Sequence, residues 1–298
     1  MKHKVTITLI LLSMFLVTQF IGLFVISQAY PLPYGLQTPE EVQGGSGFFS
    51  IILSFVIAMA LIMILIKYKW KIVIRLWFFI VVAIAIGITL NSVLSHFIIY
   101  SSIAALIIAT PVAFMKIFRP NFFVHNITEL LIYPGIAAVF VPILTVWSVI
   151  ALLIIISIYD MWAVWRSGIM QKMAKFQMEE LKIFGGFLIP SVSKKVKLQI
   201  QKLKKKYKGK EIPKKALNKK LKVSLAMLGG GDVVFPIITA GVFLINFGLI
   251  SALFITFGAL VGLSTLLFLS HKKKFYPAMP FISAGIFLGM IIWKVLLG

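Results

Sequence analysis

Long apolar segments dominate the chain, and polar residues, glycine or proline bound each of them. A helix that crosses a bilayer needs about 20 consecutive, mostly apolar residues. Nine segments meet this requirement, so the pattern predicts nine transmembrane helices. Their expected ranges are 5–29, 48–67, 72–91, 94–116, 127–143, 144–165, 222–244, 247–270 and 279–297. Without the break at Pro142, two of these would merge and the number would fall to eight.

The composition agrees with this pattern. Hydrophobic residues make up 60% of the 298 residues and charged residues only 13%, whereas soluble domains carry about 25% charged residues. A water-soluble core could not bury so much apolar surface, so a soluble globular protein is excluded. A disordered chain is excluded because it would be far more polar. Cysteine is absent, which rules out disulfides, thiolate metal sites and a cysteine nucleophile.

Basic residues lie almost entirely on one side of the predicted spans. The net charge is +22, and alternating the nine spans places 29 of the 30 lysines and arginines on the side of the N-terminus. Only Lys294 lies on the other side, together with Glu40 and Glu41. By the positive-inside rule, we expect a multi-pass protein of the cell membrane with its N-terminus in the cytoplasm and its C-terminus outside.

A long basic connection divides the chain into three expected parts. Residues 1–165 form an N-terminal membrane part with six spans, residues 166–221 a cytoplasmic loop, and residues 222–298 a C-terminal membrane part with three spans. The lysines of the loop suit contact with anionic lipid head groups, and no feature typical of nucleic-acid binding accompanies them. The uncharged run 183–190 within the loop predicts a strand, a lid or a stretch lying on the membrane.

Only two aspartates occur in the chain, and both fall within predicted spans. Asp160 precedes Arg166 by about 9 Å of helix rise, and Asp232 follows Lys222 by about 15 Å. Both distances run inward from the cytoplasmic boundary, so we expect the two carboxyls at comparable depth on adjacent spans. An ionisable side chain at this depth costs at least about 3 kcal/mol. We therefore interpret the pair as a functional site.

Two carboxyls within hydrogen-bond reach share one proton and titrate as a pair. The ionised member can take a proton from water that attacks an amide carbon, while the protonated member donates to the carbonyl oxygen, as in aspartic proteases. Two other roles stay open for the same residues. They could hold two helices together as a buried polar pair, or carry protons or cations in a secondary transporter.

Glycine and proline weaken the helices near these acids. Three glycines, residues 229–231, directly precede Asp232, and Pro236 lacks the N–H that would bond the Asp232 carbonyl. Residues 277–280 form an unwound entrance to the last span. Irregular backbone at membrane depth is tolerated only beside water or protein. These features predict a hydrated cavity in which an extended peptide could lie.

Three motifs resemble those of the presenilin and signal peptide peptidase family of intramembrane aspartyl proteases. They are Tyr159-Asp160 in one span, Gly-x-Gly-Asp from Gly229 to Asp232 in the next, and a Pro-Ala-Leu-type motif, here Pro277-Ala278-Met279, before the last span. Methionine replaces leucine in the third motif, a swap of similar size. The short loop before Asp232 is similar to that of the archaeal homologues, and its cytoplasmic placement is similar to presenilin.

The resemblance implies an all-α, presenilin-like fold of nine transmembrane helices. It implies a single-chain endopeptidase that cleaves transmembrane helices of other membrane proteins, without a cofactor, a metal or an obligatory partner subunit. Asp160 and Asp232 would be catalytic. The substrate, bound as an added β-strand, would contact Tyr159, Gly229, Gly230, Gly231, Pro277, Ala278 and Met279.

Other classes fit the sequence less well. A secondary transporter should have inverted repeats with paired broken helices, and only one acidic span broken by glycine and proline is found. Ser46 lies in a Gly-x-Ser-Gly motif typical of rhomboid proteases, but in a glycine-rich external loop. The four histidines are isolated, and the His-Glu-x-x-His motif of zinc proteases is absent.

Overall fold

The computed structural model describes residues 5–36, 70–167, 185–191, 224–270 and 276–297, with isolated residues between 53 and 68. Within these ranges, eight helices are long and apolar enough to cross a membrane. They are α1 (Val5–Gln28), α3 (Lys71–Leu94), α4 (Ser101–Phe118), α5 (Phe122–Phe140), α6 (Val146–Trp162), α10 (Gly231–Phe247), α11 (Leu249–Leu269) and α12 (Met279–Leu297). Each overlaps one predicted span. The ninth, 48–67, falls largely outside the described residues.

The break predicted at Pro142 is present. Pro142 lies in the short 3-10 helix η2 (Val141–Ile143), which separates α5 from α6. The side chain of Thr145 then caps α6 by accepting a hydrogen bond from the backbone N–H of Ser148. The two spans are therefore separate helices joined by a very short connection.

The predicted helix from residue 222 is wrong in its first part. Residues Ser224–Gly229 form strand β2, which pairs antiparallel with β1 (Gly186–Ser191), and α10 begins only at Gly231. An apolar run of this length suits a strand as well as a helix, and the paired strand satisfies its backbone while the glycines interrupt helix formation. The strand expected as one possibility within 183–190 is the partner.

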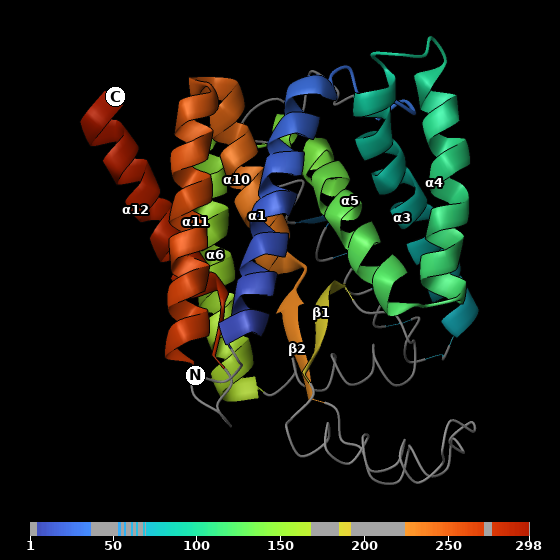
Figure 1. The fold of residues 1–298 in the computed structure, drawn as a ribbon. Helices are drawn as coiled ribbons and strands as arrows, with labels where there is room; N and C mark the ends of the chain where they lie inside the picture. Colours follow the sequence, from blue (N-terminus) through green and yellow to red (C-terminus); the bar gives the residue numbers. More distant parts are fainter. Residues whose placement is uncertain are drawn as a thin grey trace, which may run out of the picture.

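The two paired strands β1 and β2, termed the β-hairpin, shorten the helix that carries Asp232. The 17 residues of α10 span about 25 Å, less than the hydrocarbon core of about 30 Å. Figure 1 shows that α10 accordingly begins part of the way along the bundle, where β2 ends. Asp232 thus lies at a junction of strand and helix rather than within a continuous span, as the helical rise had suggested.

The helices form one bundle. Contacts join α1, α5 and α10 at its centre, while α3 and α4 pack on one side and α6, α11 and α12 on the other (Figure 1). Helices α11 and α12 approach closely, because a Cβ on Gly258 or Gly262 would collide with the α12 backbone. This agrees with the Gly-x-x-x-Gly pattern of both helices.

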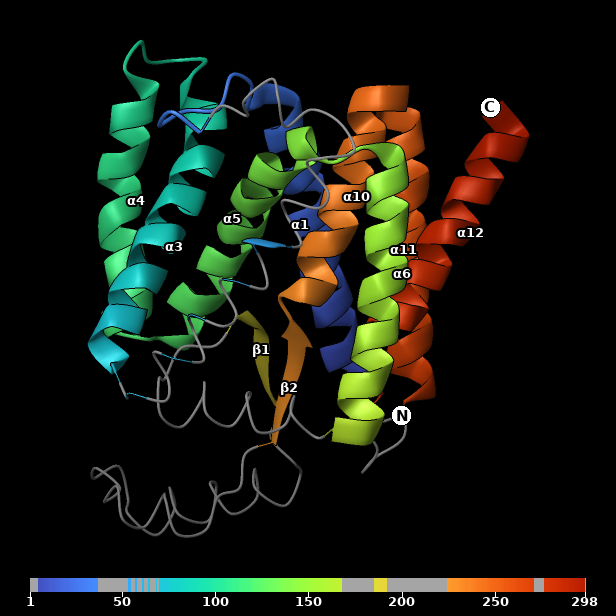
Figure 2. The same ribbon diagram turned by 180° about the vertical axis from the view of Figure 1, so that it is seen from behind.

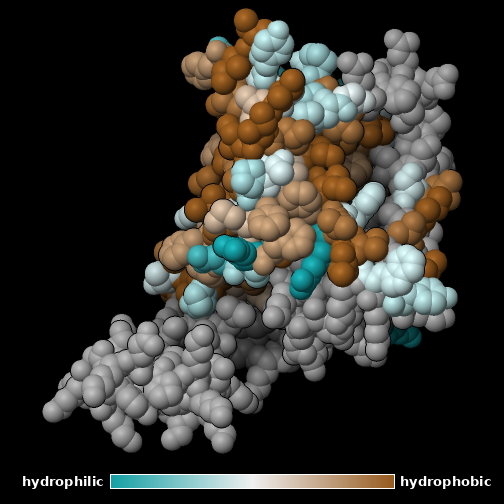
Figure 3. Space-filling view, turned by 90° about the vertical axis from the view of Figure 1, so that its right-hand side faces the viewer, coloured by the Kyte–Doolittle hydropathy of each residue, from teal (hydrophilic) through white to brown (hydrophobic). Residues whose placement is uncertain are grey.

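The outer surface is apolar, as expected for a protein surrounded by lipid. On the side of α3 and α4, hydrophobic residues cover most of the coloured surface in Figure 3. Many large apolar side chains are exposed there, among them Trp77, Ile103 and Ile107. Helix α1 begins and α12 ends at opposite ends of the bundle, and the β-hairpin lies at the end where α1 begins (Figure 1).

Candidate active site

Asp160 meets the start of the last helix. It lies two residues before the end of α6, and only 6% of its surface is exposed. The backbone N–H of Met279, the first residue of α12, donates a hydrogen bond of 3.0 Å to its Oδ2. The backbone of Ala278 is a second hydrogen-bond partner. Because Pro277 and Pro280 have no N–H, both donors of this turn meet the same carboxyl.

Neighbouring contacts fix this arrangement. One turn before Asp160, the hydroxyl of Ser157 donates a buried hydrogen bond of 2.9 Å to the hydroxyl of Ser283 on α12. Directly after α6, residues Ala163–Ser167 form the π-helical segment η3, a feature common at functional sites. The bonds from Ser157 to Ser283 and from Met279 to Asp160 thus join the end of α6 to the start of α12.

Asp232 lies in the first turn of α10 and is half-buried. The backbone of Gly229 is a hydrogen-bond partner of its carboxyl, and the charge of Asp160 acts on it electrostatically. The two acids therefore interact across the contact between α6 and α10. Each carboxyl also lies at the N-terminus of a helix, Asp160 at that of α12 and Asp232 at that of α10, where the helix dipole stabilises negative charge.

The three glycines before Asp232 have different surroundings. A Cβ on Gly229 would lie 3.1 Å from Oδ2 of Asp232, and a Cβ on Gly230 would lie 2.8 Å from the hydroxyl oxygen of Tyr133. A Cβ on Gly231 would make only an ordinary contact of 3.5 Å with Phe235. Gly229 and Gly230 are therefore required by close packing, whereas the surroundings of Gly231 leave room for a side chain.

Two further polar side chains reach the turn of Asp232. Gln19 of α1 is fully buried and donates a hydrogen bond of 3.0 Å from Nε2 to the carbonyl oxygen of Val233. Tyr133 of α5 is buried, and its hydroxyl makes no hydrogen bond to any residue that the structure describes, while the charges of Glu129 and Asp232 act on it electrostatically. The sequence analysis singled out neither Gln19 nor Tyr133.

Of the other residues predicted to contact the substrate, residues 277–279 lie at Asp160, whereas the side chain of Tyr159 does not. Ala278 and Met279 meet Asp160 directly, and Pro277 is buried beside them. Tyr159 is 49% exposed, and its ring packs against Trp162 on the same helix at 6.2 Å between ring centroids. Its side chain therefore points away from the buried carboxyl of Asp160, the next residue along the chain.

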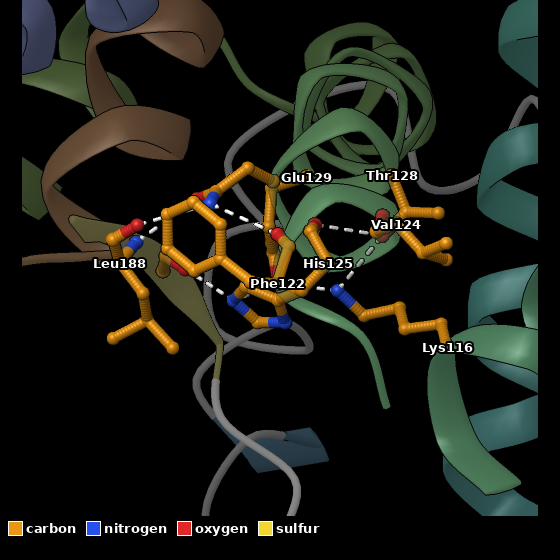
Figure 4. Close-up of polar contacts among 9 residues, drawn as sticks. Lys116, Phe122, Val124, His125, Thr128, Glu129 and Leu188 are labelled. Atoms are coloured by element: carbon orange, nitrogen blue, oxygen red, sulfur yellow. Dashed lines mark hydrogen bonds and ion pairs between the residues drawn. The ribbon is translucent and has the colours of Figure 1, made fainter. Parts of the chain in front are cut away.

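A buried polar cluster on α5 was missed by the sequence analysis. The ammonium of Lys116 on α4 lies 2.5 Å from Oε1 of Glu129, and 5% and 2% of these two side chains are exposed. Nε2 of His125 lies 3.7 Å from the same carboxylate oxygen (Figure 4). Glu129 carried a usable signal, because an acid within the predicted span 127–143 is a candidate functional residue.

Across the described ranges, no three His, Cys, Asp or Glu side chains gather closely enough to hold a metal ion. The pair of carboxyls in these ranges is bound by backbone N–H donors, and the side chains of Gln19 and Tyr133 lie beside the turn of Asp232. Such a pair can hold one proton in common and exchange it with a water molecule or a peptide group between them.

A bundle of apolar helices around two interacting aspartates defines a multi-pass membrane protein of the aspartyl-protease type. Residues 12–298 match the family of signal-peptide peptidases and presenilin aspartyl proteases, and the chain belongs to this family. The resemblance inferred from the three motifs is thereby confirmed.

Two solved structures share the fold. One is a presenilin family intramembrane aspartate protease in a C222 crystal, 18% identical, with a TM-score of 0.62 over 97% of this chain and 99% of that one. The other is a presenilin family intramembrane aspartate protease in a P2 crystal, 21% identical, with a TM-score of 0.59 over 96% and 98%. No curated protein matches the chain at a significant level.

Proposed function

We propose that the protein is an endopeptidase that hydrolyses peptide bonds within transmembrane helices of other membrane proteins, with Asp160 and Asp232 as its catalytic pair. The observation that carries this proposal is the contact between α6 and α10, which brings the two acids together, with Asp160 bound by the N–H of Met279 at the start of α12 and Asp232 in the first turn of α10. The family supports it, since aspartyl proteases use two carboxyls that share a proton.

The reaction follows from the shared proton. The ionised carboxyl takes a proton from a water molecule as its oxygen attacks the carbonyl carbon, and the protonated carboxyl donates its proton to the carbonyl oxygen. The carboxyl that took the proton from water then donates it to the amide nitrogen, the other carboxyl takes a proton from a hydroxyl of the tetrahedral intermediate, and the C–N bond breaks, which restores the singly protonated pair. Asp160 and Asp232 act as a unit in these steps, so we assign no separate acid and base.

We propose that the substrate unwinds and pairs with β2 as an added strand. In both Figure 1 and Figure 2, β2 lies between β1 and α6, so its outer edge is on the side of the helix that carries Asp160. A strand on that edge would run past Gly229 towards Asp232. We propose that Gly229, Gly230, Gly231 and residues 277–279 contact it, with Tyr159 at the periphery.

We propose the full topology from the charge distribution. Segment 48–67 adds a ninth span, the N-terminus and the loop 166–221 lie in the cytoplasm, and the C-terminus lies outside. The three parts then remain 1–165, 166–221 and 222–298. The 29-to-1 split of basic residues supports this arrangement. We also propose that a single chain acts without a cofactor or partner subunit.

A cleavage assay separates this proposal from the proton- or cation-coupled transporter. The purified protein in detergent is mixed with a synthetic transmembrane peptide, with and without a transition-state analogue of aspartyl proteases. We expect two peptide products whose formation the analogue blocks, because the analogue occupies the carboxyl pair. Absence of products, combined with uptake of protons or cations by loaded vesicles, would favour the transporter.

Activity should follow a bell-shaped pH profile. The pair with one proton is the active form, because the doubly ionised pair lacks a donor and the doubly protonated pair lacks a base. The initial rate of peptide cleavage, measured from about pH 4 to pH 9, should rise and fall once. A flat profile over this range would contradict a shared catalytic proton.

A further inference from the structure

The direction of the backbone groups along β1 follows from its pairing with β2. The N–H of Gly230 donates to the carbonyl oxygen of Gly185 at 3.3 Å, in line with the register that pairs Gly186 with Gly229. In an antiparallel ladder, successive residues alternate between facing the partner strand and facing away. The backbone groups of Gly186, Leu188 and Pro190 therefore point away from β2.

Helix α5 binds this outer edge of β1. The backbone N–H of Leu188 donates to Oδ1 of Asn126 at 3.0 Å, and Nδ2 of Asn126 donates to the Leu188 carbonyl oxygen at 3.0 Å. Nε2 of His125 lies 2.7 Å from the Gly186 carbonyl oxygen (Figure 4). Pro190 has no N–H to offer. Helix α5 therefore binds both outward groups of Leu188 and the carbonyl of Gly186, and Pro190 offers no N–H to an added strand.

The amide of Asn126 acts here as one peptide group of a neighbouring strand. It carries a donor and an acceptor, which is what the outward face of one strand residue requires. Asn126 is 8% exposed, and Nδ2 also donates to the carbonyl oxygen of Phe122 at 3.1 Å, which fixes the amide in this orientation. Neither an aliphatic side chain nor a carboxylate could make both bonds to Leu188.

The outer edge of β2 differs from that of β1. By the same alternation, the backbone groups of Leu225, Met227 and Gly229 point away from β1. Gly229 bonds the Asp232 carboxyl. Among the residues described, none makes a hydrogen bond to the outward groups of Met227, whose side chain is 42% exposed. An unpaired strand edge accepts an added strand, and of the two strands that the structure describes, β2 is the one with such an edge.

We propose that Asn126, assisted by His125, is a positioning residue that closes β1 and fixes the hairpin, so that a substrate strand pairs with β2 in one register relative to Asp160 and Asp232. This inference rests on the proposed peptidase function. It assigns a role in cleavage to a residue of α5 that touches neither acid. The choice of scissile bond then depends on Asn126, because a slip of the hairpin would present a different peptide bond to the pair.

The test uses Asn126→Ala and Asn126→Asp, with Asn121→Ala as the matched control. Asn121 is also on the α5 side, but its side chain caps the helix through the N–H of Phe123 and does not touch β1. Products from a transmembrane peptide are identified by mass spectrometry, and binding of a transition-state analogue is measured in the same samples.

For both Asn126 variants, we expect cleavage to fall on the order of tenfold, as for one to two lost hydrogen bonds. We also expect the products to spread over neighbouring peptide bonds. Analogue binding should persist, and Asn121→Ala should match the wild type.

The wild-type product pattern and rate in both Asn126 variants would overturn the proposal. So would loss of analogue binding in both, because Asn126 would then support the fold as a whole. If the wild-type chain cleaves nothing, the peptidase proposal fails instead. In that case, hydrogen exchange at residues 186–191 still tests the edge closure, since Asn126→Ala should expose the Leu188 amide to faster exchange than in the wild type. Unchanged exchange would contradict it.

Discussion

At the scale of single residues, backbone N–H groups stabilise both acids. Asp160 accepts from Met279 and Ala278, and Asp232 from Gly229. Backbone donors at a helix N-terminus stabilise negative charge without bringing a cationic side chain into the membrane. They also leave the remaining lone pairs of each carboxyl available for a water molecule and a peptide carbonyl. The precise backbone path around each acid therefore matters as much as the acid itself.

Gly229 and Gly231 allow a matched test of this backbone path. Gly229→Ala would place a methyl group 3.1 Å from Oδ2 of Asp232, so the carboxyl must move by a few tenths of an ångström. A misplacement of about 1 Å costs about hundredfold in rate, so this smaller shift should cost less. We expect Gly229→Ala to lose about three- to tenfold in the initial rate of peptide cleavage.

Gly231→Ala is the control, because its methyl group would contact only Phe235 at an ordinary 3.5 Å. We expect it to retain most of the wild-type rate. A bulky Gly231→Leu should still fold but hinder an approaching peptide, so that cleavage is lost while a transition-state analogue still binds. Equal rates for the two alanine variants would contradict the assignment of separate roles to these glycines.

At the scale of elements, a strand and a short helix replace one long span. Strand β2 leads directly into α10, so the strand edge proposed to bind the substrate lies only a few residues before Asp232 in the chain. Helix α5 stabilises this junction from the other side through β1, and α4 stabilises α5 through the buried pair of Lys116 and Glu129. The position of Asp232 therefore depends on helices that are remote from it in sequence.

The ion pair between α4 and α5 gives a prediction about stability. Removing one partner of a buried pair costs about 3–5 kcal/mol, because the other charge stays buried and unpaired. We expect Glu129→Ala to lower the unfolding free energy in detergent by about this amount. The double variant Lys116→Met with Glu129→Leu should recover most of the loss, since neither charge remains. A single variant as stable as the wild type would mean that the pair contributes little.

The sequence predicted the elements whose signal is local. Eight apolar segments became helices, and Asp160, Asp232 and the glycine and proline motifs were visible as short patterns. The strand Ser224–Gly229 was not predicted, because a short apolar run suits a strand or a buried helix equally. Asn126 was not identified as functional, since its partner Leu188 lies 62 residues away on another element. Such contacts exist only in the folded chain.

At the scale of the whole molecule, the bundle places the start of α1 and the β-hairpin at one end and the end of α12 at the other, as the charge distribution predicts (Figure 2). With 29 basic residues assigned to the side of the N-terminus, that side is expected in the cytoplasm. The active pair would then be reached from the cytoplasmic half of the membrane.

Reporter fusions test this orientation. A reporter that is active only in the cytoplasm should be active when fused after Lys206 and silent when fused after Gly298. Expression of both fusions at the same level, measured by immunoblot, is the control. The opposite pair of results would reverse the topology, and the positive-inside argument for this chain would fail.

The central claim is that Asp160 and Asp232 hydrolyse peptide bonds together. The most direct measurement is the rate at which Asp160→Asn and Asp232→Asn each produce fragments from a transmembrane peptide, compared with the wild type in the same detergent. Asparagine keeps the size of the side chain but cannot exchange a proton, so we predict that each single variant forms no fragments while remaining folded. Fragment formation at the wild-type rate by either variant would contradict the account.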